Sequence, residues 1–466
     1  MKRAVPMIIS EKNFRQIFDF ADRNARLAKL LYNAALFRIR QVFTGWDKGD
    51  KRTELEQSVF DEIQYTRQVY NGFTCRRVLS YKALDKILRA NTDPDFFSGL
   101  PMQTAQNIVR QAVTDFRSWL DALKVYKDDA SAFTGKPKMP KYCRLDKKTF
   151  KVTNQDAVLY PSDDGKGCLL KLPQMKGSRI PLSYLQAASE LREIVFKPYY
   201  GKYIMTFVVE DMVPPFYPDM PYMAGLDLGT DNIAAIACTD GSSVVYKGGA
   251  VLSSNQFFAK HKASAVSILT RGKKDRYASS TYLDGLSLKH DCFIKDQMHK
   301  ISTAIVRYCA EHRIGILVVG TNRNWKQHSS MGQKSNQKFV SIPHEKLRWM
   351  ISYKAMTAGI DVIWQEESYT SKADCTSGDV IPVYGEAETR PVFSGRRIER
   401  GSYLCGQGYR INADCNGAAN ILRKAFPDAW RRFTDFHFLA TPVSIGFKSL
   451  NPVVFGNRQK QLASHR

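Results

Sequence analysis

The sequence predicts an α+β protein built of several domains, and three observations indicate this. Residues 16–125 carry apolar side chains at helical spacing, residues 150–215 alternate apolar and polar side chains, and from residue 222 short apolar strands alternate with helices. With 466 residues, of which 44% are hydrophobic, the chain is long enough for roughly three domains with cores of their own. We therefore expect a helical domain, a small β domain and a larger mixed domain.

The charge balance favours a polyanionic partner. The chain has 69 Lys and Arg residues against 45 Asp and Glu residues, a formal net charge of +24, and nucleic acid is the first candidate for such a surface. No apolar run reaches about 18 residues, so we expect no membrane partner. The 9 cysteines, scattered from Cys75 to Cys415, do not form a disulfide framework. We expect a soluble, cytoplasmic protein.

The helical region is followed by a basic segment, FTGKPKMPKYCRLDKKTFK. Its cations lie among prolines and aromatic residues, a composition that suits an extended segment on a phosphate backbone. A solvated basic loop is the alternative for any single cation. The candidate nucleic-acid-binding residues of this segment are Lys136, Lys138, Lys141, Arg144, Lys147 and Lys148.

The next segments are strands. CLLKLPQ and LREIVFKPYYGKYIMTFVVE predict a small β domain with a hairpin that turns at Gly201. MAGLDLG, NIAAIAC and SSVVYKG then predict three antiparallel strands, the last two joined by a turn at Asp240 and Gly241.

The order of the remaining elements predicts the fold of the last domain. A basic helical stretch, the strand GILVVG, a helix that starts near Ser341 and Pro343, and the strand DVIWQEE follow. A polar, glycine-rich insertion (374–408) separates them from a final helix that begins near Asp414. This order is that of an RNase H-like fold, in which the first strand lies centrally beside the fourth and the fifth lies beyond it.

Two acids in this domain are candidates for metal chemistry. Asp227 interrupts an apolar strand, where a charge is costly unless it is paired or binds metal; an Asp that caps a turn is the alternative. Asp414 begins the last helix, where an N-terminal cap is the ordinary role. Metal-dependent hydrolysis of a phosphodiester needs several carboxylates around Mg²⁺ or Mn²⁺.

Five stretches of the chain resemble the transposon-encoded TnpB family and the compact type V CRISPR nucleases related to it. They are LAKLLYNAALFRIRQ, GKPKMPKY, GLDLGTDNIAA, EESYTSKAD and INADCNGAANILRK, which occur in family order and span nearly the whole chain. The resemblance implies a helical recognition domain (16–125), a wedge-like β-barrel domain (1–15 and 126–218), a RuvC nuclease domain (219–373 and 409–430), a degenerate zinc-finger-like insertion (374–408) and a C-terminal tail (431–466).

The resemblance also implies an RNA-guided DNA endonuclease. Such a protein, expected here as a monomer, binds a structured guide RNA, recognises a short motif beside its double-stranded DNA target, and hydrolyses DNA with Mg²⁺ or Mn²⁺. The family's first and third acids fall on Asp227 and Asp414, and Asn416 matches the D-x-N motif as a supporting residue, with a surface polar residue as the alternative. Two other functions stay open: a nuclease-inactive RNA-guided repressor, and a guide-independent nucleic-acid-binding protein of a mobile element.

The second acid of the family is missing. Its position falls on Gly320, at the end of the fourth strand, and glycine cannot bind metal. Glu366 and Glu367 end the neighbouring parallel strand, whose carboxyl end opens on the same edge of the sheet, so either the acid has moved by one strand or the nuclease is inactive. Successive residues of a strand face opposite ways, so we expect one of the two to bind metal.

The zinc motif is also altered. The four positions where the family carries Cys fall on Asp374, Ser377, Leu404 and Gln407, and Cys375 and Cys405 lie one residue out of register, so we expect no zinc. Other basic or aromatic residues are candidates for nucleic-acid contacts, with solvated loops and a packed Trp as the alternatives. They are Arg271, Lys273 and Lys274 before the long helix, Trp325 and Lys326 after the fourth strand, and Arg396 and Arg397 in the insertion.

Overall fold

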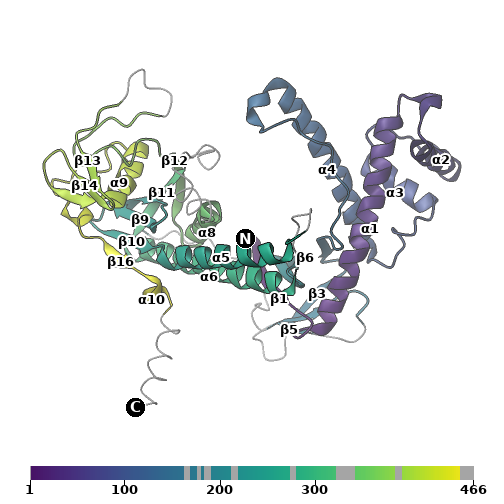
Figure 1. Ribbon diagram of the computed structural model, residues 1–466, viewed down its shortest axis with the longest axis horizontal. Helices are drawn as coiled ribbons and strands as arrows, with labels where there is room; N and C mark the ends of the chain where they lie inside the picture. Colours follow the sequence, from purple (N-terminus) through teal and green to yellow (C-terminus); the bar gives the residue numbers. More distant parts are fainter. Residues whose placement is uncertain are drawn as a thin grey trace, which may run out of the picture. The chain divides into compact units, whose positions relative to one another are not determined.

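The chain folds as an α+β protein with two compact units, Met1–Val213 and Pro214–Arg466 (Figure 1). The computed structural model describes residues 2–161, 168–175, 180–182, 190–210, 219–272, 280–321, 342–383 and 391–451. Within these ranges no helix is both long enough and apolar enough to cross a lipid bilayer. The two units are described separately below.

The first unit contains the predicted helical region. Its helices are α1 (Arg15–Gly45), α2 (Glu54–Val69), α3 (Tyr81–Ala90) and α4 (Met102–Asp128), with short 3₁₀ helices η1 (Gly49–Lys51) and η2 (Ala130–Ala132). Helix α2 begins at a capping box, in which Thr53 accepts from the Glu56 backbone and the Glu56 carboxylate accepts from the Thr53 backbone.

The strands of the first unit form two small antiparallel sheets. One has the order β1-β7-β6-β2 and consists of β1 (Lys2–Ile9), β2 (Phe150–Thr153), β6 (Glu190–Tyr199) and β7 (Lys202–Glu210). The other consists of β3 (Val158–Pro161), β4 (Cys168–Lys171) and β5 (Ile180–Leu182). The predicted hairpin turns at Tyr200 and Gly201, whose φ angles of 47° and 70° lie in the left-handed region that tight hairpin turns require.

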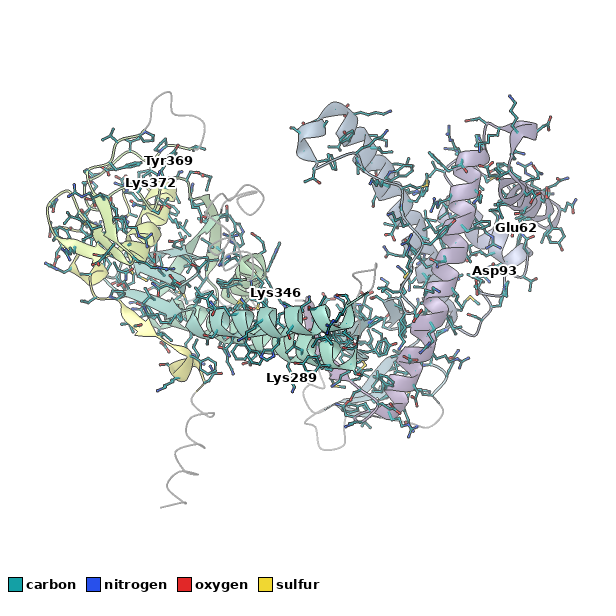
Figure 2. The ribbon with its side chains drawn as sticks, in the orientation of Figure 1. Glu62, Asp93, Lys289, Lys346, Tyr369 and Lys372 are labelled. Atoms are coloured by element: carbon teal, nitrogen blue, oxygen red, sulfur yellow. The ribbon has the colours of Figure 1, made fainter. Side chains whose placement is uncertain are left out.

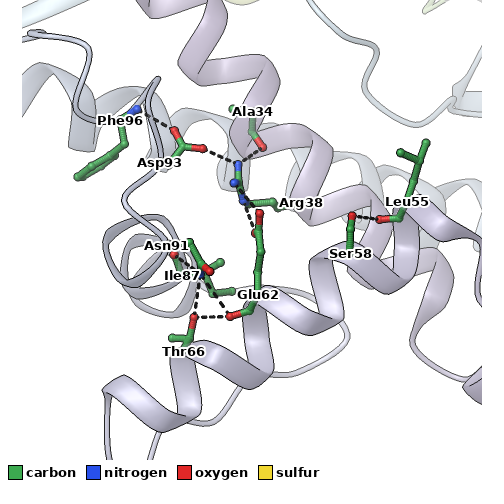
Figure 3. Close-up of polar contacts among 10 residues, drawn as sticks. All are labelled: Ala34, Arg38, Leu55, Ser58, Glu62, Thr66, Ile87, Asn91, Asp93 and Phe96. Atoms are coloured by element: carbon green, nitrogen blue, oxygen red, sulfur yellow. Dashed lines mark hydrogen bonds and ion pairs between the residues drawn. The ribbon is translucent and has the colours of Figure 1, made fainter.

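A buried ion-pair cluster joins three parts of this unit (Figure 3). The guanidinium of Arg38 in α1 donates from Nε and Nη2 to the two oxygens of Glu62 in α2, at 2.6 and 2.8 Å, and its Nη1 lies 2.9 Å from Asp93 Oδ2. Asp93 in turn accepts from the backbone N–H of Phe96 at 2.8 Å. Because removing one member of a buried pair leaves an uncompensated charge, the cluster fixes the mutual arrangement of these segments.

The second unit is built on a six-stranded sheet with the order β12-β11-β8-β9-β10-β16. Its strands are β8 (Tyr222–Asp227), β9 (Asn232–Cys238), β10 (Ser243–Lys247), β11 (Ile314–Thr321), β12 (Asp361–Glu366) and β16 (Val443–Ile445). Strands β8, β11 and β12 run parallel, and β9 is antiparallel to both β8 and β10. The first strand therefore lies beside the fourth and the fifth lies beyond it, which confirms the predicted RNase H-like order.

Helices flank this sheet. They are α5 (Gly249–Leu269), α6 (Thr281–Glu311), α8 (His344–Thr357), α9 (Ala413–Ala425), η3 (His437–Leu439) and α10 (Phe447–Leu450). Helices α5 and α6 lie side by side (Figure 1). Helix α9 packs closely on β8, because a Cβ at Gly225 would overlap the carbonyl oxygen of Ala418.

Two features of the second unit differ from the sequence prediction. The insertion contains two strands, β13 (Arg396–Glu399) and β14 (Ser402–Leu404), which form a small sheet with β15 (Arg410–Asn412) just after it. Part of the expected C-terminal tail belongs to the main sheet, because β16 pairs with β10 and Phe436 and Leu439 are buried in its core. The reason is local: these residues are apolar enough to cover the edge that β10 would otherwise leave open.

Candidate active site

Three carboxyl groups from separate parts of the second unit line one pocket. Asp227 ends β8, Glu367 directly follows β12, and Asp414 lies in the first turn of α9. The ends of β8 and β12 meet at one edge of the sheet because both strands run parallel to β11. The carboxyl edge of such a sheet is where ligands bind in open α/β folds.

Asp227 lies against helix α9. An ideal Cβ at Gly417 would lie 2.8 Å from Asp227 Oδ2, so the glycine leaves the space that this carboxyl group occupies. Burial, together with the negative charges of Glu367 and Asp414, raises the pKa of Asp227 to about 8. The protein therefore concentrates negative charge at a site that has too little solvent to screen it.

Glu367 occupies the space beside Gly320. Its backbone N–H donates to Thr321 O at 3.1 Å, which holds the residue at the end of β11. An ideal Cβ at Gly320 would lie 2.5 Å from Glu367 Oε2, so the carboxylate fills the position of a missing side chain. Burial raises the pKa of Glu367 to about 7, and Oε2 has no hydrogen-bond partner among the described residues.

Glu366, the other candidate for the relocated acid, does not line the pocket. Its Oε2 lies 2.5 Å from Lys424 Nζ, and its Oε1 accepts from the Ser368 backbone N–H at 2.7 Å. Burial alone would raise the pKa of Glu366, but the Lys424 ammonium and the Ser368 hydrogen bonds outweigh it and lower the pKa. Of the two acids, the structure brings only Glu367 to Asp227 and Asp414.

Asp414 does not cap its helix. The cap is Asn412, whose side chain accepts from the backbone N–H groups of Asp414 and Cys415 at 3.0 and 3.1 Å. The Asp414 carboxylate is thereby left to face the pocket, where Oδ2 accepts from Asn232 Nδ2 at 2.6 Å and Oδ1 lies 3.6 Å from Arg397 Nη2.

Asn416, expected as a supporting residue, forms its hydrogen bonds inside the protein. Its side chain is fully buried, accepts from the Cys375 backbone N–H at 3.0 Å and donates to Ala373 O at 2.8 Å. Both polar atoms are therefore used within the protein, and the amide anchors the loop after β12 to α9. A polar residue near a helix start is as suited to such an anchor as to a ligand site.

Basic and aromatic side chains surround the acids. Arg397 and Arg400 of the β13–β14 hairpin line the pocket, and Arg400 also pairs with Asp231 on the loop after β8. Lys247 at the end of β10 lines the pocket as well. Tyr369 lies on the loop after β12 with the Lys372 ammonium 5.9 Å from its ring centre (Figure 2). The sequence prediction missed Lys247 and Asn232, because only the closed hairpin brings their strands to this edge.

The predicted basic segment lies in the first unit and is docked on its helices. Trp119 Nε1 donates to Pro137 O at 3.2 Å, and the Asn33 side chain forms hydrogen bonds with the backbone of Cys143. Lys147 pairs with Asp22, and the Lys148 ammonium lies 3.6 Å from the Tyr32 ring centre. These two cations therefore serve to hold the segment. The cations that remain exposed are Lys136, Lys138, Lys141 and Arg144.

The other predicted nucleic-acid contacts are distributed more widely. Arg271 is exposed just after α5, and Arg396 and Arg397 are exposed on β13. Lys273, Lys274, Trp325 and Lys326 lie outside the described residues.

Hydrogen bonds connect the two halves of the insertion at the expected zinc positions. Asp374 is fully buried and accepts from the Gly406 N–H at 2.7 Å and from Thr376 N and Oγ1 at 2.9 and 2.7 Å. Asp379 accepts from the backbone N–H groups of Asp374 and Ser394. Cys375 and Cys405 are buried in a hydrophobic core, where burial raises the pKa of both thiols.

The donor set of the pocket suits a hard divalent cation. Three carboxyl groups, one with an unpartnered buried oxygen and two with raised pKa values, are what Mg²⁺ or Mn²⁺ would stabilise. Among the described residues, no three His, Cys, Asp or Glu side chains converge closely enough to form a ready-made metal cluster. Asn232 donates to Asp414 Oδ2 and Arg397 lies 3.6 Å from Oδ1, and these contacts leave lone pairs of the carboxylate available to a metal.

Two family models match segments that lie almost entirely in the second unit. The model described as a probable transposase, OrfB_IS605, matches residues 207–326, and the model described as Cas12f1-like, TNB domain, matches residues 344–421. The first match contains Asp227, and the second contains Glu367 and Asp414.

A relative and a solved structure extend the comparison. The TnpB-like protein ORF457 of Acidianus two-tailed virus is 26% identical over 212 residues, which cover 44% of this chain and 42% of that protein. The chain thus matches less than half the length of this relative. The structure of a Cas12f1–sgRNA–target DNA complex matches with a TM-score of 0.50 and 13% identity, over 88% of this chain and 83% of that one. These findings confirm that the chain resembles the TnpB family and the compact type V effectors.

Proposed function

We propose that this TnpB-like chain is an RNA-guided DNA endonuclease whose RuvC acids are Asp227, Glu367 and Asp414. The observation that carries the proposal is the position of Glu367. Its carboxylate fills the space beside Gly320, where relatives carry the second acid, and it shares a pocket with the other two carboxyl groups. Loss of the second acid alone does not account for a carboxylate that fills the space beside Gly320.

The chemistry follows from the donors around the pocket. When bound, Mg²⁺ supplies an activated water and neutralises the leaving oxygen of the cleaved phosphodiester. Asp227, Glu367 and Asp414 would hold the metal. Arg397, Arg400 and Lys247 line the same pocket and would bind the DNA phosphates, because guanidinium and ammonium groups donate to phosphate oxygens.

The guide RNA and the DNA target are the proposed partners. A net charge of +24 and the exposed cations of the basic segment support binding of nucleic acid. Base pairing between guide and target strand would provide sequence specificity, and the protein would read the backbone and the adjacent motif. The domain boundaries expected from the sequence are part of this proposal, except that Phe436, Leu439 and β16 of the expected tail belong to the nuclease domain.

The first experiment measures cleavage of plasmid DNA by the purified ribonucleoprotein with Mg²⁺. We expect cutting by the wild type, loss of cutting by Glu367→Gln, and retained cutting by Glu366→Gln, which has the same chemistry but removes an acid outside the pocket. Because Glu366 pairs with Lys424, its variant is expected to be less stable. Equal activity of the two variants would contradict the assignment of Glu367.

A double variant that moves the acid from residue 367 back to residue 320 tests the relocation directly. Glu367→Ala should abolish cleavage, and Gly320→Glu added to it should restore part of the activity, because a side chain at residue 320 enters the space that the Glu367 carboxylate leaves. Gly320→Glu alone should reduce cleavage, since its Cβ would lie only 2.5 Å from Glu367 Oε2. No recovery in a folded double variant would count against a shared position.

The nuclease-inactive repressor is the second candidate function. Gly320, at the position where the family carries its second acid, favours it. Guide-dependent DNA binding without any Mg²⁺-dependent cutting would support the repressor over the nuclease.

A further inference from the structure

Tyr369 adopts a strained backbone conformation beside the candidate active site. It follows Glu367 on the loop after β12, and its φ angle of 65° lies in the left-handed region, which a bulky side chain adopts only at a cost in free energy. Such conformations persist where the surrounding structure enforces them, and they cluster at active sites and ligand-binding loops. Tyr369 is therefore a candidate for a role in the pocket.

Hydrogen bonds on both sides of Tyr369 enforce this conformation. Thr370 Oγ1 donates to the carbonyl oxygen of Glu367 at 2.8 Å, and the Tyr369 carbonyl oxygen accepts from the Ala373 N–H at 3.0 Å. The fully buried side chain of Asn420 in α9 donates to Thr370 O at 2.9 Å and to Ala373 O at 2.7 Å. Helix α9 therefore holds the loop that presents Tyr369.

The pocket combines three kinds of side chain. Carboxyl groups suited to metal and the cations suited to phosphate are described above. Among the described residues that line this pocket, Tyr369 is the only aromatic one. A nucleotide consists of a phosphate, a sugar and a base, and an aromatic ring is the side chain on which a base stacks. Tyr369 thus supplies the one kind of nucleotide contact that the acids and cations do not.

The ring of Tyr369 is placed for contact with a ligand and not for packing in a core. Its side chain is partly exposed, with the Phe393 ring centre at 6.2 Å and the exposed Lys372 ammonium at 5.9 Å from its own ring centre (Figure 2). These neighbours support the ring while part of its surface remains accessible. A tyrosine needed only for packing would gain little from a strained position of this kind.

We propose that Tyr369 binds, by stacking, the base of a nucleotide beside the cleaved phosphodiester, and so fixes the strand against the three acids. The inference rests on the proposed nuclease function. Every base has an aromatic face, so stacking positions a strand without selecting its sequence. That property suits a site whose target would be chosen by base pairing with a guide.

The test measures single-turnover cleavage by the ribonucleoprotein with Mg²⁺, on DNA that is intact or abasic at one of the two nucleotides flanking the mapped cut. Tyr369→Gly removes the ring and relieves the strain, so it should melt no lower than the wild type yet cleave intact DNA about 10-fold more slowly. Tyr369→Phe keeps the ring and should cleave like the wild type.

The abasic DNA separates stacking from a structural role. Loss of one of the two flanking bases should slow the wild type about 10-fold and leave the rate of Tyr369→Gly unchanged, because that variant has no stacking to lose. A missing base that slows both proteins equally would overturn the inference and leave the nuclease proposal intact.

Tyr282→Ala is the matched control. Tyr282 is another tyrosine of the same unit, 57% exposed at the start of α6, and it does not line the pocket. Its variant should cleave intact DNA at the wild-type rate and respond to the abasic nucleotide as the wild type does. A response lost in this variant as well would contradict a specific role for Tyr369.

A binding measurement decides the inference if the wild type does not cut. The full-length chain in EDTA is titrated into a short single-stranded oligothymidylate that carries one 2-aminopurine, whose fluorescence falls on stacking. Saturating wild type and Tyr282→Ala should quench it more than Tyr369→Gly does. Equal quenching by all three proteins would reject the stacking role, whereas weaker quenching by Tyr369→Gly would support it even though the nuclease proposal had failed.

Discussion

The two buried carboxyl groups of the pocket give the metal-free protein a specific pH dependence. The pKa values of Asp227 and Glu367, about 8 and about 7, lie above the ordinary values of about 3.9 and 4.3 in an unfolded chain. Between pH 4 and 8 the unfolded chain has therefore released protons that the folded protein still binds. Stability contributed by these groups is present below pH 4 and is lost as the pH rises through 7 and 8.

We accordingly expect the melting temperature of the wild type in EDTA to fall between pH 6 and 8.5 relative to that of Asp227→Asn. The variant lacks the charge that becomes costly, so its profile should be flatter. Mn²⁺ should remove most of the difference at pH 8, because metal replaces the protons. Parallel profiles for the two proteins in EDTA would show that these carboxyl groups do not titrate as described.

Gly417 offers a separate test of the Asp227 position. An ideal Cβ there would lie 2.8 Å from Asp227 Oδ2, although alanine is favoured over glycine within a helix by about 1 kcal/mol. Gly417→Ala should therefore reduce cleavage strongly while changing the free energy of unfolding little.

The matched control is Gly285→Ala in α6, where the added Cβ meets nothing within 4 Å. It should stabilise the protein by about 0.5–1 kcal/mol and leave cleavage unchanged. Equal cleavage by the two variants, measured beside chemical denaturation, would place Asp227 outside the reaction.

At this scale the sequence predicted some site residues better than others. Asp227 could be predicted because a charge inside an apolar strand is costly unless it is paired or binds metal. The choice between Glu366 and Glu367 depends on Lys424, which lies 58 positions away from Glu366 in the chain and forms an ion pair with it.

At the scale of elements, strand order was easier to predict than short strands. The positions of β8, β11 and β12 follow from the rules that govern connections between parallel strands. Strands β13 and β14 are only 4 and 3 residues long and carry a polar sequence, so no alternation distinguished them from a loop. Strand β16 could not be predicted from its own sequence, which has little alternation of apolar and polar residues. It is a strand because it pairs with the free edge of β10.

The insertion around β13 and β14 is expected to be stable without zinc. Asp374 connects the two halves of the insertion, as a zinc ion would, by accepting hydrogen bonds from both of them. Asp374→Ala leaves the Gly406 N–H without its acceptor and should lower the free energy of unfolding by about 2 kcal/mol. A strong zinc chelator should leave the melting temperature of the wild type unchanged.

Ser377→Ala is the control, since Ser377 lies at another expected zinc position but is largely solvent-accessible in its contacts with Asp379 and Ser394. Its effect on chemical denaturation should remain below about 0.5 kcal/mol. A melting temperature that falls on chelation would show that metal, and not the Asp374 hydrogen bonds, holds the insertion.

At the scale of the whole molecule, net charge predicts the class of partner but not the binding surface. The excess of +24 is spread over the chain, and some of its cations are already used internally. Lys147 and Lys148, for example, bind Asp22 and the Tyr32 ring, whereas Lys138 and Lys141 of the same segment are exposed. Sequence alone gave these four lysines equal weight, because only the docking of the segment on its helices separates them.

This division predicts how binding of the guide RNA depends on salt. Each phosphate that a cation neutralises contributes roughly 0.7 to 0.9 to the slope of log K against log salt concentration. Replacing Lys138 and Lys141 by Ala should therefore reduce the magnitude of that slope by about 1.4 to 1.8. The control removes the same charge at Lys12 and Lys51, which are exposed elsewhere in the first unit. Filter-binding titrations from low to high salt measure both slopes, and equal slopes for the two double variants would remove the basic segment from the RNA interface.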